Sequence, residues 1–296
     1  MIGPLVAMYA CTGLGLYFTP AVAREVAAYW PVLLLAGAFA ILLGACGGWI
    51  LSRITGTDRT TAFFASVPGG ATEMTVLGER FGARADRVAL AQSLRIAVVV
   101  IVVPVALAYA GVRGAEDYRP VTRPVNWPGL VALLAIASAA GGVLQGLRMP
   151  NAFMFGPLSL VTVLSANGVE ISALPGAASN VAQVLLGCAL GARFERRSLQ
   201  SAPRYVFGVL ASVMTATAAA AVLAAGTARA AGLPLGTMVL AMAPGGIAEM
   251  CITAKVLQLG VALVTAAHVT RVLVLIATTS PSYRMMRMLR ARFRGA

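Results

Sequence analysis

The sequence predicts an all-α, polytopic integral membrane protein built from two homologous repeats. Three observations lead to this fold class: the composition, the recurrence of apolar runs, and a motif that occurs twice. Of the 296 residues, 59% are hydrophobic and 11% are charged, against about 25% charged in a soluble domain. Apolar runs of about 20 residues, the length at which a helix spans a bilayer, recur along the chain.

The repeated motif reads SVPGGATEM at residues 66–74 and MAPGGIAEM at residues 242–250. An arginine follows each copy inside the next apolar run, Arg95 after the first and Arg271 after the second. The spacing is constant, because 244 − 68, 249 − 73 and 271 − 95 all equal 176. An offset shared by a proline, two glycines, a glutamate and an arginine indicates an internal duplication.

The first repeat is expected over residues 1–111. Its predicted membrane segments are the apolar runs at about 2–18, 30–52, 61–78 and 88–111. A short loop that contains Pro20 and Arg24 is expected between the first two runs. The polar, proline-punctuated residues 112–126 then predict a linker between the repeats.

The second repeat is expected over residues 127–281, followed by a basic cytoplasmic tail at 282–296. Its apolar runs lie at about 127–147, 151–166, 177–192, 205–231, 237–255 and 260–280. At an offset of 176 the first two of these runs have no counterpart after residue 1, so we expect the first repeat to lack its opening hairpin. The whole chain is predicted to contain about eight to ten membrane segments.

Each copy of the motif should break its segment into two half-helices. Proline lacks an amide donor and glycine loosens the backbone, and a broken backbone within a membrane is tolerated only inside protein or beside a water-filled cavity. If each broken segment crosses the membrane, the halves are parallel; if each is re-entrant, the halves are inverted. The arginine-rich loop at 193–204 and the basic tail should share the cytoplasmic side. The even number of crossings that this requires favours the inverted arrangement.

The glutamates and arginines of the two copies are the main candidate site residues, because an ionisable group at bilayer depth is a functional-site hypothesis. In one interpretation the two breaks meet, and their helix N-termini together with Arg95 and Arg271 bind a small anion such as a carboxylate. Glu73 and Glu249 then tune the charge or carry a coupling proton. In the other interpretation, Glu73 pairs with Arg95 and Glu249 with Arg271, which locks each half together. The ligand-binding set also includes Pro68, Gly69, Gly70, Gln92, Pro244, Gly245, Gly246 and His268.

Gln92 and His268 occupy matching places, because 268 − 92 is also 176. Each lies three residues before the arginine of its half and therefore on the same helix face. His268 could titrate as a proton switch. The alternative is that it only hydrogen-bonds a neighbouring helix, which its glutamine counterpart supports.

Several function classes are disfavoured. The net charge of +13 suits arginines in cytoplasmic loops and a tail beside anionic lipid, rather than direct nucleic-acid binding. The four cysteines stand singly, without the CxxC pairs of a zinc site, and one histidine cannot supply the ligands of a metal oxygenase. We therefore predict neither a metal nor a cofactor, and no enzymatic activity.

The doubled PGGxxEM motif with its downstream arginines resembles the AbrB family of duplicated membrane proteins, which is unrelated to the soluble DNA-binding regulator of the same name. The resemblance covers nearly the whole chain and implies a multi-pass protein of the bacterial inner membrane. Members carry the label of regulator of gene expression (an aidB regulator) and sometimes that of ammonia monooxygenase. The single histidine argues against the second label.

Our leading hypothesis is a transporter-like protein that binds a small solute, with anions favoured, at a pseudo-symmetric site between two broken helices. The alternative is a membrane-embedded regulator of gene expression that senses a ligand or acts through a partner protein, and an oxygenase ranks last. The expected partners are membrane lipid and a small-molecule ligand, without direct contact to nucleic acid. The sequence leaves homo-oligomerisation open.

Overall fold

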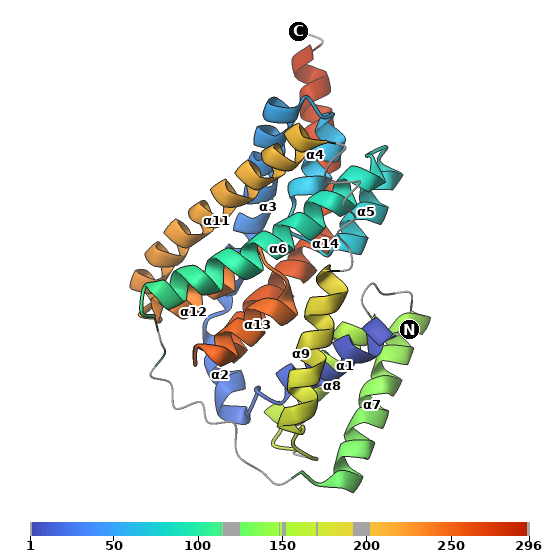
Figure 1. Cartoon of the computed structure of the whole chain (residues 1–296), viewed down its shortest axis with the longest axis vertical. Helices are drawn as coiled ribbons and strands as arrows, with labels where there is room; N and C mark the ends of the chain where they lie inside the picture. The colour runs from blue at the N-terminus through green and yellow to red at the C-terminus, as the bar shows by residue number, and fades with distance from the viewer. Residues whose placement is uncertain are drawn as a thin grey trace.

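The computed structural model describes residues 2–112, 114, 125–147, 149, 152–169, 171–191 and 202–294. Over these residues it contains 13 helices and no strand, so the predicted all-α class is confirmed. The predicted linker at 112–126 and the arginine-rich loop at 193–204 lie largely outside the described residues. Figure 1 shows the helices in two groups, a smaller one at the lower right and a larger one above it.

The smaller group combines the start of the chain with its middle. It contains α1 (Ile2–Gly15), α7 (Trp127–Gly146), α8 (Ala152–Ala166) and α9 (Gly176–Gly191). Helix α1 packs against the other three. It approaches α8 closely at Gly15: if this glycine carried a side chain, its Cβ atom would lie only 2.8 Å from the Cβ of Val161. The first helix is therefore held by helices that come much later in the chain.

The larger group holds both copies of the motif. Its helices are α3 (Trp30–Thr55), α4 (Arg59–Ser66), α5 (Ala71–Arg80), α6 (Ala85–Tyr109), α11 (Pro203–Ala231), α12 (Leu235–Met242), α13 (Ile247–Val256) and α14 (Val261–Arg294). Each of the four short helices in this group packs against at least one of the long helices α3, α6, α11 and α14. The long helices thus form the frame that positions the two motifs.

One element differs from the expectation, and another extends beyond it. The residues around Pro20 and Arg24 do not form a loop but belong to the short helix α2 (Pro20–Ala28), which Thr19 caps by accepting a hydrogen bond from the backbone amide of Val22. Proline at the first helical position favours such a start because its φ is already helical. The helix that contains the last apolar run, α14, continues beyond residue 280 to Arg294. The backbone of the basic tail is therefore helical up to that residue.

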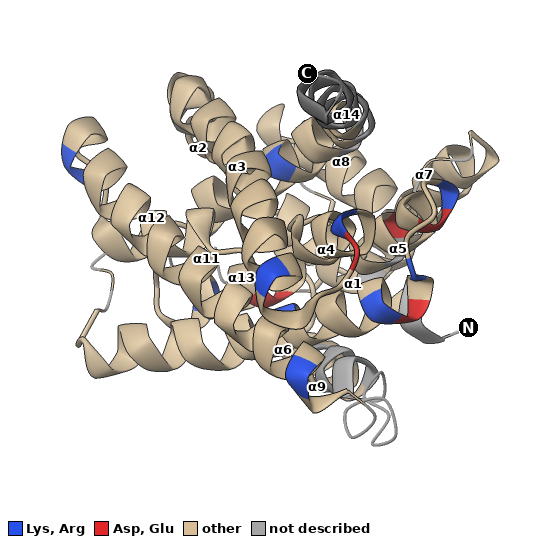
Figure 2. Ribbon diagram, turned by 90° about the horizontal axis from the view of Figure 1, so that it is seen from above, with Lys and Arg blue, Asp and Glu red and all other residues tan. Residues whose placement is uncertain are grey.

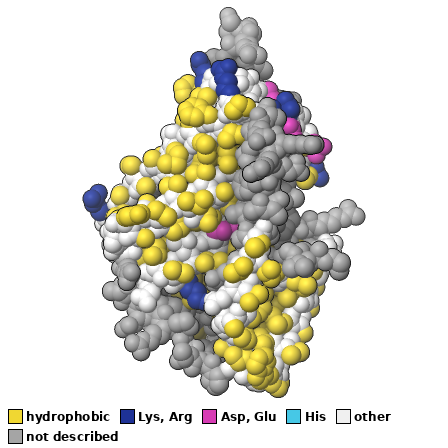
Figure 3. All heavy atoms as spheres, viewed as in Figure 1, with side chains coloured by type: hydrophobic (Ala, Val, Ile, Leu, Met, Phe, Trp, Pro, Cys, Tyr) yellow, Lys and Arg dark blue, Asp and Glu magenta, His cyan; other side chains and the backbone are white. Residues whose placement is uncertain are grey.

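Within the part of the chain that the structure describes, four helices are long and apolar enough to cross a membrane alone, namely α3, α6, α7 and α11. Helices α4 and α12 have 8 residues each, and α5 and α13 have 10 each. At about 1.5 Å per residue, each of these short helices reaches about half of a 30 Å hydrocarbon core or less. Apolar side chains cover much of the molecule in Figure 3. These are features of a helical membrane protein.

The helix bounds in the two halves correspond at the offset of 176. Adding 176 to the bounds of α4 and α5 gives the bounds of α12 and α13. The left-handed residues correspond as well, since Gly56 and Gly232 have φ of 70° and 66°, and Gly82 and Gln258 have φ of 82° and 55°. The local backbone is therefore the same in both segments.

Helices α3 and α11, which correspond at this offset, run in opposite directions. Near the end of α3, the Ile54 carbonyl accepts a hydrogen bond from Arg204 Nε at the start of α11 (2.9 Å). Earlier in α3, the Gly47 carbonyl accepts one from Ser212 Oγ, which lies further along α11 (3.1 Å). Late residues of one helix thus meet early residues of the other, as the crossing ribbons in Figure 1 also show.

Helices α6 and α14, the other long corresponding pair, are also antiparallel. Just before α6 begins, the Arg84 amide donates to Thr61 Oγ1 of α4 (2.9 Å). The neighbouring Thr60 shares a hydrogen bond with Tyr283, which lies far along α14 (2.6 Å). The beginning of α6 and the later part of α14 therefore lie at the same end of the molecule.

Both broken segments return to the end from which they start. The hydrogen bond from the Arg84 amide to Thr61 Oγ1 joins the chain just after α5 to the first turn of α4. The Gly260 amide donates in the same way to Thr237 Oγ1 in the first turn of α12 (3.2 Å). The pairs α4–α5 and α12–α13 are therefore hairpins. The antiparallel long helices place these hairpins at opposite ends of the larger group.

The end that holds the start of the first hairpin is rich in arginine. The helix ends and loops at this end carry Arg53, Arg59, Arg80, Arg84, Arg87 and Arg204. Arg229 and Lys255, in the last turns of α11 and α13, lie at the other end. Figure 2 shows few charged residues along the lengths of the helices, and several of the basic side chains visible in Figure 3 lie near its upper end. The charge is thus distributed unequally between the two ends.

Helix α3 approaches the first hairpin closely because of its glycines. A Cβ on Gly44 would lie 2.8 Å from the Cα of Val67, and a Cβ on Gly48 would lie 3.0 Å from the Cα of Phe63. Both neighbours are backbone atoms, which cannot rotate away as a side chain can. Small residues of this kind allow two helices in a membrane protein to approach each other.

We predict that Gly44→Ala lowers the melting temperature of the detergent-purified protein. The hairpin backbone must shift to make room, and overpacking of this kind typically costs about 1–3 kcal/mol. Gly226→Ala in α11 is the matched control, because among the described residues no atom lies within 4 Å of the added Cβ. This control should gain about 0.5–1 kcal/mol, since alanine favours a helix interior over glycine. Equal melting temperatures for the two variants would contradict the close packing at Gly44.

Candidate functional site

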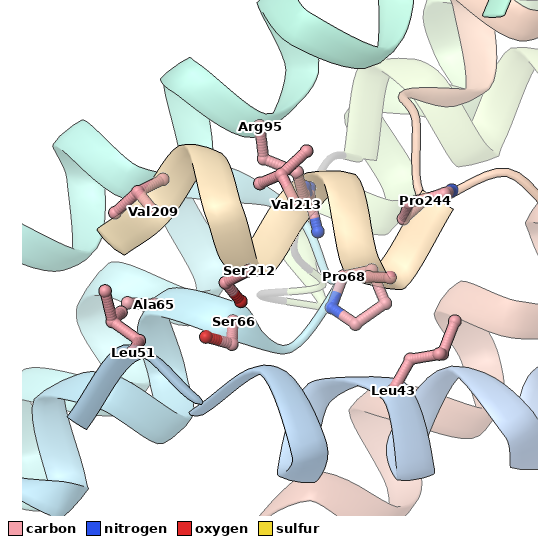
Figure 4. A pocket seen from close by; sticks show the side chains of 11 residues that line it. Leu43, Leu51, Ala65, Ser66, Pro68, Arg95, Val209, Ser212, Val213 and Pro244 are labelled. Atoms are coloured by element: carbon pink, nitrogen blue, oxygen red, sulfur yellow. The ribbon is translucent and has the colours of Figure 1, made fainter. Parts of the chain in front are cut away.

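The segments between the short helices meet at one small cavity. Residues 67–70 separate α4 from α5, and residues 243–246 separate α12 from α13. Pro68 and Pro244 both line the cavity, together with Arg95 of α6. Figure 4 shows the Arg95 side chain extending from α6 toward Pro68, with Pro244 nearby. Two stretches far apart in the sequence are therefore brought to one place.

Both arginines bind the backbone at these breaks. Arg95 donates from Nη1 to the Val67 carbonyl (3.3 Å) and from Nη2 to the Gly69 carbonyl (3.0 Å). Arg271 donates in the same way from Nη1 to the Ala243 carbonyl (2.6 Å) and from Nη2 to the Gly245 carbonyl (2.7 Å), the matching residues of the second half. The same two-pronged contact is thus built twice.

These contacts have an electrostatic consequence. The last carbonyls of a helix lack intrahelical partners and carry the negative end of its dipole. Val67 is the C-cap of α4 and Ala243 the C-cap of α12, so each guanidinium places positive charge at a negative helix end. Arg95 and Arg271 are 3% and 4% exposed, which leaves little competition from water. The arginines therefore stabilise the breaks themselves, through carbonyl acceptors that neither interpretation of the sequence included.

The glutamates of the motif lie at the positive ends of the following helices. Glu73 is in the first turn of α5, and Glu249 is in the first turn of α13. The Glu249 carboxylate fills the space in which a Cβ on Gly246 would lie, so it folds back over the N-cap. A carboxylate at this position stabilises a helix N-terminus. Each break is thus bounded by an arginine on one side and a glutamate on the other.

The first glycine and the methionine of each motif copy are in contact. A Cβ on Gly69 would lie 2.8 Å from the Met74 side chain, and a Cβ on Gly245 would lie 2.8 Å from that of Met250. Met74 and Met250 are 1% and 0% exposed. The methionine therefore packs over the break, which requires a glycine there and explains this spacing within the motif.

Gln92 and His268 hold the preceding turn of each broken segment. Gln92 Nε2 donates to the carbonyls of Phe64 (2.8 Å) and Val67 (2.9 Å). His268 Nε2 lies 3.0 Å from the carbonyl of Leu240, which is 176 residues after Phe64. A carbonyl can only accept, so Nε2 of His268 carries the proton. This contact to α12 agrees with the interpretation in which His268 hydrogen-bonds a neighbouring helix.

Several polar atoms around the breaks remain without a partner. Within the described residues, Nε of Arg95, Nε of Arg271, Oε1 of Gln92 and Nδ1 of His268 are buried and make no hydrogen bond. Arg95 also interacts electrostatically with Arg271 and with Glu249 of the other half. A buried polar atom without a partner costs about 1–3 kcal/mol. These atoms are therefore candidate contacts for water or for a bound solute.

The cavity at the breaks is small. Its volume is about 10 Å³, and a single water needs about 10–15 Å³. Ser66 and Ser212 also line it and lie near each other in Figure 4. Sequence reasoning missed both serines, because nothing in the sequence shows that α11 passes beside the first break. In this conformation the cavity has room for about one water.

The predicted site residues therefore fall into three sets. Those that line the cavity are Pro68, Pro244 and Arg95. Those that form the hydrogen-bonded and packed frame around the breaks are Gly69, Gln92, Gly245, His268 and Arg271. Those at the starts of α5 and α13 are Gly70, Glu73, Gly246 and Glu249.

We predict that Arg271→Ala strongly destabilises the protein in detergent, as measured by its melting temperature. Two buried carbonyls lose their donors, at about 1–3 kcal/mol for each. Arg271→Lys should fall between wild type and Arg271→Ala, because an ammonium lacks the planar fork that binds two acceptors. The exposed Arg229→Ala serves as the control and should melt close to wild type. A melting temperature of Arg271→Ala equal to that of this control would show that the carbonyl contacts do not stabilise the fold.

We predict that replacing His268 by glutamine, the residue at the matching position of the first half, leaves the stability of the protein nearly unchanged. His268→Gln keeps an N–H that reaches the Leu240 carbonyl, so its melting temperature should stay near that of wild type. His268→Leu leaves this buried carbonyl without a donor and should cost about 1–3 kcal/mol. The same thermal measurement, repeated across pH 5–8, also tests the proton-switch alternative. A pH dependence that is present in wild type and absent in His268→Gln would support titration of the histidine.

Comparisons with known proteins identify the family of this chain. The family described as "Transition state regulatory protein AbrB" matches residues 3–287. "Uncharacterized protein YhjN" of Bacillus subtilis (strain 168) is 30% identical over 264 residues, which are 83% of this chain and 68% of that protein. "Putative regulator AbrB" of Escherichia coli (strain K12) is 26% identical over 265 residues, which are 88% of this chain and 75% of that protein. The resemblance inferred from the motif is thereby confirmed: this chain belongs to the AbrB family.

Proposed function

We propose that this protein is a membrane carrier for a small solute, which binds where the two broken segments meet. The observation that carries the proposal is the shared cavity, which is lined by Pro68 and Arg95 from one half and by Pro244 from the other. Irregular backbone at membrane depth belongs beside protein or a water-filled cavity, and broken helices form the solute sites of many carriers. A site of this kind supports transport.

The arrangement of the halves supports the same function. We infer that they arose by duplication and form inverted repeats, because corresponding helices share bounds at an offset of 176 and run antiparallel. Inverted repeats are a common plan of secondary transporters, in which the solute site lies between the repeats. Hairpins that enter from opposite ends would give each side of the membrane its own path to the breaks.

The proposed orientation places the arginine-rich end in the cytoplasm of a bacterial cell, following the positive-inside rule. The later part of α14 lies at this end, so the C-terminus is also cytoplasmic. Among the described residues, the four long apolar helices, the three remaining helices of the smaller group, α14 and the two re-entrant hairpins would make ten membrane segments, at the upper end of the eight to ten expected from the sequence. This is the topology of a multi-pass inner-membrane protein in contact with lipid.

A small anion is the solute class that the charges favour. Arg95 and Arg271 each keep a buried Nε without a hydrogen-bond partner within the described residues. The cavity volume of about 10 Å³ excludes an organic solute from the breaks in this conformation. Loading therefore requires the elements around the breaks to move apart, as a carrier that alternates between two conformations must do.

A membrane-embedded regulator is the second candidate function. The family description and the name of the Escherichia coli relative both contain a regulatory term. In that case a ligand at the breaks would change a surface that a partner protein recognises. Movement of the ligand across sealed vesicles distinguishes the two functions, because a sensor only binds it.

The test begins with a thermal-shift screen of small organic anions, in which a ligand at about 100 times its dissociation constant stabilises by roughly 2.7 kcal/mol. Uptake of each hit is then measured in proteoliposomes for wild type, Ala216→Phe and Ala218→Phe. Ala216 lines the cavity, so a phenyl ring there should abolish uptake. Ala218 is an exposed residue of the same helix, so its variant should transport like wild type.

Each outcome of this test separates the alternatives. Uptake that survives in Ala216→Phe would place the solute path away from the breaks. Wild-type protein that binds a screened anion without moving it across the vesicle membrane would refute the carrier and favour the regulator.

A further inference from the structure

A second, larger hollow lies between the two groups of helices. It is lined by residues of α1 and α9 from the smaller group and of α13 from the larger group. Its volume is about 60 Å³, against about 10 Å³ for the cavity at the breaks. Since one water needs about 10–15 Å³, this hollow can accept a solute of a few non-hydrogen atoms. This conformation therefore has room for a small ligand in this hollow.

The hollow follows one face of α13 toward the second break. Ala248, Cys251, Ile252 and Lys255 line it, and their spacing of three and four residues puts them on the same side of the helix. Ala248 lies in the first turn of α13 and Lys255 in the last. At about 1.5 Å per residue the hollow extends about 10 Å along the helix axis. It leads from the exposed Lys255 to the start of the helix that follows the break.

The facing wall is mostly apolar with a few fixed polar groups. Leu14 of α1 and Leu174 before α9 supply apolar surface. The Tyr9 hydroxyl donates to the Pro175 carbonyl (3.2 Å), and Ser179 adds a hydroxyl to the lining. Apolar walls with a small number of placed polar groups are typical of small-molecule sites.

Positive charge lies at the outer end of the hollow. Lys255 stands there and is the single lysine of the chain. The other residues that line the hollow are uncharged. An anion that enters the hollow therefore meets the Lys255 ammonium without a competing carboxylate in the lining.

We propose that this hollow is a binding site through which the solute enters, and that it selects small monocarboxylates with a short apolar chain. Lys255 pairs with the carboxylate, and the alkyl chain lies against Leu14, Leu174 and Ile252. The assignment of this site as an entrance rests on the proposed carrier function, whereas the binding of the carboxylate does not.

The face of α5 that corresponds to the lining face of α13 differs from it in exposure and charge, which fits an entrance on one side of the protein only. Val76 of α5 corresponds to Ile252 at the offset of 176, and it is 46% exposed. Glu79 corresponds to Lys255 and is exposed as well, with the opposite charge. The wall formed by α1 and α9 stands beside α13. In this conformation the hollow therefore opens at the end opposite the arginine-rich one.

Protection of Lys255 from acylation tests the site directly. An amine-reactive reagent modifies Lys255 and the N-terminal amine, which serves as the internal reference, and mass spectrometry quantifies each product. Wild-type protein in detergent is treated with acetate, butyrate, hexanoate or butylammonium. At about ten times the dissociation constant only about one site in eleven is free, so acylation of Lys255 should slow about tenfold. Butyrate should protect at lower concentrations than acetate, by about fourfold for each buried methylene.

Two variants provide the controls for charge. Lys255→Ala should lose the thermal stabilisation by butyrate, whereas Arg229→Ala, which removes an exposed cation at the same end outside the hollow, should keep it. Equal protection by butyrate and butylammonium, or an unchanged butyrate shift in Lys255→Ala, would overturn the site. Proteoliposome uptake is measured separately. If butyrate protects Lys255 but is not taken up, the carrier function is refuted and the binding site is not. If butyrate is taken up without protecting Lys255, the binding site alone is refuted.

Discussion

Two guanidinium groups allow the backbone of this protein to be interrupted in its apolar interior. The carbonyls that follow α4 and α12 have no helical partners, and Arg95 and Arg271 supply the donors. Without these donors the buried carbonyls of Gly69, Ala243 and Gly245 would lose a charged hydrogen-bond partner in an apolar surrounding, whereas the Val67 carbonyl would still accept from Gln92 and from the Gly69 amide. The hairpins, the cavity between them and the packing of methionine over glycine all depend on a break at this place.

The breaks are largely neutralised by the chain itself. An arginine meets the negative end of each first half-helix, and Glu73 or Glu249 lies at the positive end of the helix that follows. The site expected from the sequence combines the helix N-termini with Arg95 and Arg271, and in the structure these groups already have partners within the chain. In the proposed carrier, the atoms that remain for recognition include the arginine Nε groups, together with surfaces next to the breaks. The hollow along α13 has both the room and the charge for the second of these.

Much of this architecture could be predicted from the sequence, because local rules govern it. Proline and glycine interrupt helices wherever they occur, so the PGG stretches marked the ends of α4 and α12, and the constant offset located their counterparts. Contacts between distant segments could not be predicted. Spacing alone does not say whether a guanidinium meets a carboxylate or a carbonyl, and Ser212 reaches the first break only because α11 packs against α3.

The corresponding turns after the two hairpins show how an identical backbone can carry different chemistry. Arg80, Arg84 and Arg87 lie at the end of α5, in the turn and at the start of α6, and the residues at the matching positions around the second turn are Val256, Gly260 and Leu263. The backbone of both turns is the same, down to the left-handed residue at Gly82 and Gln258. Clustered arginines resist translocation across a bilayer. In the orientation proposed above, the arginines therefore keep the end of the first hairpin in the cytoplasm, and the second hairpin, which lacks them, is free to face the other side. The orientation of each hairpin then depends on side-chain charge and not on the backbone that the two have in common.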